Sequence, residues 1–168
     1  MALNNIIGAA TKIAEFLGFV ESVDSKVTKL LHQSLKSAIS NLEYAQHSNG
    51  QNQIEYIKQA RVEFNQAVNV EEDENKILAL TGLSICQSLL GDKGNASETY
   101  NRISQVELSL KEQAKYTAID VAAGWGGLAG GYLLKKMGLR NAVTCIASRQ
   151  DTFRIVKQSA LSMARKYL

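Results

Sequence analysis

Few residues in this sequence have the types and spacing that catalysis or metal binding requires. The only histidines are His32 and His47, and Glu43 precedes His47 by four residues, a spacing that shares one helix face. Structural and catalytic zinc sites use at least three protein ligands, so we expect an exposed ion pair here. Cys86 and Cys145 lie far apart and fit no disulfide framework or metal-ligand motif, which predicts two buried, reduced thiols. With no nucleophile elbow or Walker loop either, we assign no catalytic residue and no metal ligand.

The most unusual stretch is glycine-rich and runs from Ala122 to Gly138. Its spacing Ala122-x-Gly124-x-x-Gly127 resembles the phosphate-binding turn of flavin and nicotinamide enzymes, in which glycines let the backbone approach a pyrophosphate. Alanine replaces the first glycine, however, and Ala147-Ser148 stands where the ribose-binding acid belongs. The remaining chain is also too short for the rest of a doubly wound sheet. We therefore expect no cofactor.

Two other interpretations treat the same stretch as a helix. Ala123, Gly127 and Gly131 recur every fourth residue, so they form a stripe of small side chains that allows close helix packing in a soluble core. The cost is about 1 kcal/mol of helix stability per interior glycine, which tight packing must offset.

The alternative interpretation is contact with a membrane or another anionic partner. The uncharged run from Val121 to Leu134 is shorter than the roughly 20 residues that span a bilayer. A helix could still insert with its neighbours or lie in the interface, where each basic residue contributes about 1 kcal/mol near anionic lipid. The candidate contact residues are two aromatic residues and the basic residues that follow them: Trp125, Tyr132, Lys135, Lys136 and Arg140.

Charge is unevenly distributed along the 168 residues, although the net charge is only +3. Residues 1–120 carry 11 basic and 15 acidic side chains, whereas residues 121–168 carry 8 basic side chains and a single acid, Asp151. This asymmetry predicts that the last third faces an anionic partner or the acidic part of its own fold. A pI of 8.8 and the lack of a recognition motif argue against nucleic acid.

Apolar periodicity predicts helices throughout, and proline, which breaks helices, is absent. Ser48-Asn49-Gly50 and Gly91-Asp92-Lys93-Gly94 are expected to be turns. We expect the acids Glu71–Glu74 to be a solvated helix start, and Ser104-x-x-Glu107 to be a capping box that opens a further helix. The expected helices cover about 3–20, 52–70, 75–90 and 152–168. A long helix is expected between Ser25 and Ser48, a short one after Gly94 that contains Ala96 to Ile103, and another after Ser104 that continues to Val121.

A weak internal repeat links two of these helices. Ala60-x3-Phe64-x2-Ala67 returns 36 residues later as Ala96-x3-Tyr100-x2-Ile103, after Leu80-x2-Leu83 and the turn Leu90-Gly91-Asp92. This order resembles a tetratricopeptide repeat over residues 54–103, a resemblance that implies stacked helical hairpins and a concave surface for a peptide. Gln87 stands where that family usually has an aromatic residue, and the helix-ending proline is missing.

The sequence therefore predicts an all-α protein of six or seven helices, arranged as an antiparallel stack or bundle. We divide it into an N-terminal amphipathic segment (1–21), a repeat-like stack (22–115) and a glycine-rich basic hairpin (116–168). The expected function is non-enzymatic binding of a protein or peptide, with self-association as a further expectation. The alternative is a membrane-active effector that uses residues 121–140 and the N-terminal helix. With no basic n-region ahead of the apolar start, we expect a cytoplasmic protein, membrane-associated under the alternative.

Overall fold

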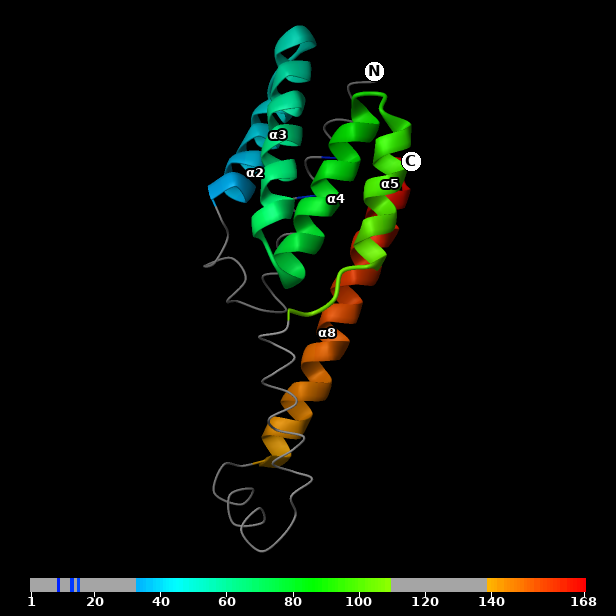
Figure 1. The fold of residues 1–168 in the computed structure, drawn as a ribbon. Coiled ribbons are helices and arrows are strands. Elements are labelled where there is room, and N and C mark those ends of the chain that lie inside the picture. Colours follow the sequence, from blue (N-terminus) through cyan, green and yellow to red (C-terminus); the bar gives the residue numbers. More distant parts are fainter. Residues whose placement is uncertain (1–8, 10–12, 14, 16–32, 110–138) are drawn as a thin grey trace, which may run out of the picture. The chain divides into compact units, whose positions relative to one another are not determined.

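A computed structural model describes Ala9, Ile13, Glu15, residues 33–109 and residues 139–168, with the side chains of the last range described from residue 150 onward. All regular structure in these residues is helical: α2 (Gln33–Gln46), α3 (Gly50–Val70), α4 (Asp73–Leu89), α5 (Lys93–Ser104) and α8 (Leu139–Arg165). The predicted all-α class is therefore confirmed for the described part of the chain. Figure 1 shows α2 to α5 following one another through short connections.

The chain forms two compact units. The first comprises Met1–Val106 and Val156–Leu168, and the second comprises Glu107–Ile155. The boundary falls inside α8, so the last turns of this helix belong to the first unit. The domain limits predicted after residues 21 and 115 lie outside the described residues and stay predictions.

The core of the first unit is built by consecutive helices, in which α2 packs on α3, α3 on α4, and α4 on α5. The predicted stripe of α3 is buried at Ile57, Ala60, Phe64 and Ala67. The stripe of α2 is buried in the same way at Leu35, Ala38, Leu42 and Ala45. Of the N-terminal segment, Ala9 and Ile13 are buried as well.

Helix α4 is the central element of this core. It is buried nearly all round, as its continuous apolar composition predicts. Its three hydroxyl side chains each donate to a carbonyl oxygen: Thr81 to Ile77 at 2.7 Å, Ser84 to Ala96 at 2.9 Å, and Ser88 to Tyr167. Because buried polar groups are costly without partners, these bonds let a polar row lie inside the core.

Close approach of α3 and α4 depends on a glycine. A Cβ atom placed on Gly82 would lie 2.4 Å from two ring carbons of Phe64, whose side chain is fully buried. Heavy atoms in packed interiors stay about 3.5–4.0 Å apart, so the ring occupies the space that any other residue at position 82 would need.

The turns follow the residues expected to make them. Gly50 (φ +60°) and Gly91 (φ +85°) adopt the left-handed backbone that glycine tolerates best. At the second turn the amide of Gly91 donates to Ser88 O and that of Asp92 to Gln87 O, the two bonds of a Schellman motif that ends α4. The Asp92 carboxylate then accepts from the Asn95 amide and caps α5.

Of the expectations for polar segments, the helix start at Glu71–Glu74 is confirmed, because α4 begins at Asp73. The expected solvation of these acids is wrong in part, and the capping box at Ser104 is wrong. Glu71 and Glu74 are buried, with only 4% and 2% of their surfaces exposed, because the sharp corner between α3 and α4 turns them inward. The Asn75 side-chain amide donates to the Glu71 carboxylate at 3.0 Å. Ser104 does not open a helix, because it is the last residue of α5 and its hydroxyl donates back to Asn101 O.

Replacing Gly82 with alanine should destabilise the fold. The added methyl group must displace the Phe64 ring or separate α3 from α4, and overpacking of this kind typically costs about 1–3 kcal/mol. Urea denaturation measures the change in the free energy of unfolding. Gly94→Ala in α5 is the matched control, because a Cβ there meets nothing within 4 Å; this variant should be neutral or slightly more stable. Equal losses in both variants would contradict the packing argument.

Candidate functional site

The residues that follow α8 directly, Tyr167 and Leu168, are held against α4 and α5 by bonds to their backbone carbonyl groups. Lys93 Nζ, at the start of α5, donates to Tyr167 O at 2.7 Å and to Leu168 O at 2.9 Å. The Ser88 hydroxyl donates to Tyr167 O as well. Carbonyl groups at a helix C-terminus lack partners within the helix and carry partial negative charge, so a lysine there is stabilising.

A second contact fixes the direction of α8 along α5. Lys157 Nζ donates to Ser104 O at 3.2 Å, at the opposite end of α5 from Lys93. The two helices therefore run antiparallel, and Figure 1 shows the last turns of α8 beside α5. The apolar face of these turns is buried at Val156, Ala160, Met163 and Ala164, as the sequence predicts.

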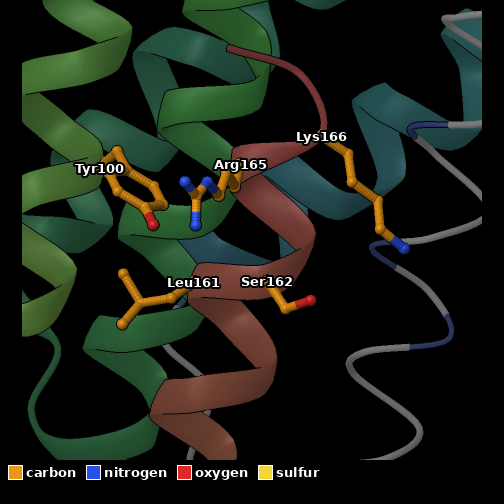
Figure 2. A pocket seen from close by; sticks show the side chains of 5 residues that line it. All are labelled: Tyr100, Leu161, Ser162, Arg165 and Lys166. Carbon is orange, nitrogen blue, oxygen red and sulfur yellow. The ribbon is translucent and has the colours of Figure 1, made fainter.

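A pocket of about 420 Å³ opens along this seam, within the size range of ligand sites. We name it the α5–α8 pocket; it is lined by Tyr100, Leu161, Ser162, Arg165 and Lys166. In Figure 2 the Tyr100 ring and the Arg165 guanidinium point toward one another, with Leu161 beneath them. Ser162 and Lys166 lie on the other flank of α8.

The pocket is cationic. Arg165 and Lys166 are exposed, and within the described residues no acidic side chain forms an ion pair with either of them. By contrast, Arg154 on the same helix has a partner, since its Nη2 lies 2.9 Å from Asp151 Oδ1. The lining therefore offers two uncompensated positive charges, one aromatic ring, one hydroxyl group and one aliphatic side chain.

The chemistry of the pocket lining is limited to cations, a phenol, a hydroxyl group and an aliphatic side chain. The pocket lining contains no carboxylate, imidazole or thiol that could activate the Ser162 hydroxyl as a nucleophile. Among the residues that the structure describes, no group of three histidine, cysteine or acidic side chains could hold a metal ion. Glu43 and His47 are both exposed near the end of α2, but they form no ion pair with each other, so this part of the prediction is wrong.

The other reactive group of the described chain is a buried thiol. Cys86 lies inside α4 with no exposed surface, as the sequence predicts. Burial raises the pKa of this thiol to about 12, and the positive charge of Arg61 offsets part of that rise. Thiols react as thiolates, so Cys86 is chemically inert in the folded protein. The side chain of Cys145 lies outside the described residues.

Most of the site residues named from sequence fall outside the described residues: Ala123, Trp125, Gly127, Gly131, Tyr132, Lys135 and Lys136. Arg140 lies in the first turn of α8, but its side chain is not described. The α5–α8 pocket itself was not expected. The sequence marks Tyr100 only as the aromatic residue of the repeat, and Arg165 and Lys166 only as part of the basic excess of residues 121–168. Leu161 and Arg165 are four residues apart, as are Ser162 and Lys166, so the sequence places each pair on one face of the helix.

Comparison with known proteins gives no relative. No family model, no curated protein and no solved structure matches this chain. Within residues 33–109 and 139–168, no helix combines the length and the apolar character needed to cross a membrane. Function must therefore be inferred from the site alone.

Cys86 should resist alkylation in the folded protein and react once the chain unfolds. Iodoacetamide labelling at pH 8, followed by peptide mapping, distinguishes Cys86 from Cys145.

Stability should also depend on pH, because the Cys86 thiol ionises near pH 9 in the unfolded chain and near 12 in the folded chain. Between those two pH values the thiol of the unfolded chain loses its proton while the thiol of the folded chain keeps it. The free energy of unfolding therefore falls as the pH rises through this range. Cys86→Ala should show a smaller loss of stability over that pH range than the native chain. Rapid labelling of native Cys86 would contradict the assignment.

Lys93→Met should loosen the end of α8. Removing the cation from the terminal carbonyl groups should cost about 1 kcal/mol. It should also speed hydrogen exchange at the amides of Lys166 and Tyr167, which bond to Met163 O and Ala164 O. Lys36→Met, an exposed lysine of α2, is the matched control. Unchanged exchange at the two amides in Lys93→Met would show that Lys93 does not hold the helix end.

Proposed function

We propose that this chain is a non-enzymatic helical binding module that holds a protein or peptide partner along the seam between α5 and α8. The observation that carries the proposal is the α5–α8 pocket, in which two cations of α8 and its C-terminal end, without an ion pair among the described residues, line a concave surface with Tyr100, about sixty positions earlier in the sequence. Aromatic and arginine side chains are the residues that most often contribute strongly to protein interfaces.

The proposed architecture is a tetratricopeptide-like stack. Support comes from the hairpin of α4 and α5, joined by Gly91 and the capping residue Asp92. Further support comes from the buried small residues Ala60 and Ala96, which occupy corresponding positions of the repeat. Tyr100, the aromatic residue of the second copy, lines the pocket, whereas Phe64 of the first copy fills the core. The two copies therefore use the same pattern for different purposes.

The alternative is an effector that acts at anionic membranes through the aromatic and basic residues between Trp125 and Arg140. Its sequence support is the strong basic excess of the last third of the chain. The two functions differ in the residue that contacts the partner: Arg165 and Tyr100 in the first, Lys135 and Lys136 in the second.

A photo-crosslinking residue at Ser162 should give a discrete protein adduct in the cells that produce the chain. The same residue at Glu55, an exposed position of α3, is the matched control and should not give that adduct. Arg165→Glu should remove the Ser162 adduct, because charge reversal repels an acidic partner. An adduct with a second copy of the chain would identify the partner as itself.

Two results would contradict the binding module. One is the absence of any adduct specific to position 162. The other is flotation of the protein with phosphatidylserine vesicles at physiological salt that is lost on Lys135→Glu with Lys136→Glu but kept on Arg165→Glu. That second pattern favours the membrane-active alternative.

A further inference from the structure

The α5–α8 pocket has features that select the chemistry of its occupant. Arg165 and Lys166 line it, and neither forms an ion pair with an acidic side chain of the described residues. A guanidinium presents a planar fork of N–H donors that matches the two oxygens of a carboxylate. The pocket therefore lacks the negative group that its cations would pair with.

The remaining lining is not charged. Tyr100 contributes a half-exposed ring and Leu161 a half-exposed aliphatic side chain, and Figure 2 shows both on the same flank as the Arg165 guanidinium. An apolar group placed on this flank would lose contact with water while a carboxylate reached the cation. A simple anion would leave this apolar part of the lining uncovered.

The docking of α8 does not account for these charges. The helix end is held by its buried apolar face and by bonds from Lys93 and Ser88 to carbonyl groups. Neither Arg165 nor Lys166 takes part in those bonds through its side chain. The two cations are therefore available to an external group, and the acidic first part of this chain does not neutralise them within the described residues.

Taking these observations together, we infer that the α5–α8 pocket binds an acidic peptide segment, in which a glutamate or aspartate carboxylate pairs with Arg165 and an adjacent apolar side chain covers Tyr100 and Leu161. This inference rests on the proposed binding function and names its partner's chemistry. Lys166 adds attraction from the other flank of α8, and the Ser162 hydroxyl can donate to a peptide carbonyl.

The test uses the full chain and two capped peptides of equal length, Ac-Gly-Leu-Glu-Leu-Gly-NH₂ and the same peptide with glutamine in place of glutamate. Binding is followed at 150 mM salt by amide chemical shifts of α5 and α8 and by calorimetry. We expect the glutamate peptide to shift the amides around Tyr100 and Arg165, and the glutamine peptide to bind on the order of tenfold more weakly or worse.

Matched variants locate the charge. Arg165→Gln should weaken the affinity for the glutamate peptide by about tenfold and leave the affinity for the glutamine peptide unchanged. Lys166→Gln should weaken the affinity for the glutamate peptide by a smaller factor. Arg102→Gln removes the same charge from an exposed position of α5 that does not line the pocket, and it should change affinity by less than about twofold. Circular dichroism of each variant confirms that the helices are retained.

Three results would overturn the inference. Equal affinity for the two peptides at the pocket would show that the site does not select a carboxylate, and the proposed binding function would stand. Equal losses in Arg165→Gln and Arg102→Gln would show diffuse attraction between charges. Absence of binding by either peptide would exclude the acidic segment, and the crosslinking result at Ser162 would then decide separately whether the chain is a binding module.

Discussion

The packing of the Phe64 ring over Gly82 joins α3 to α4, the central helix of the described core. It fixes how closely α3 approaches α4, because the ring fills the space above a residue that has no side chain. Helix α4 then presents its remaining faces to α5 and to the end of α8. The α5–α8 pocket depends on this contact only indirectly, since α4 supports both of the helices that form it.

The polar row of α4 explains how one buried helix can bond to both α5 and the residue Tyr167 that follows α8. Thr81, Ser84 and Ser88 follow one another at spacings of three and four residues, so they share a face of the helix. Their hydroxyl groups bond to α4 itself, to α5 and to the end of α8 in that order. Short side chains let the partner backbones come close, and directional bonds set the register between helices in a way that apolar contacts alone do not.

Periodicity predicted the helices and their buried faces because each stripe reports on local geometry and burial together. It succeeded for α3 and for the last turns of α8, and the glycine turn after α4 followed from backbone sterics. The expectation of solvated acids at the helix start was wrong for Glu71 and Glu74, because the packing at the corner between α3 and α4 decides whether acids there face water. The pocket required knowing that residue 100 lies beside residue 165, and no local pattern contains that information.

The charges at the end of α8 can be set against two explanations, stabilisation of the helix end and the proposed peptide partner. A cation near a helix C-terminus stabilises the carbonyl groups, so Arg165 and Lys166 could be present for that reason alone. Lys93 already bonds to those groups, however, and it comes from another helix whose position α4 fixes. The guanidinium of Arg165 points toward Tyr100 instead. Arg165 is exposed to water and also lies beside this aromatic ring, where the carboxylate of the proposed acidic peptide would complete the site.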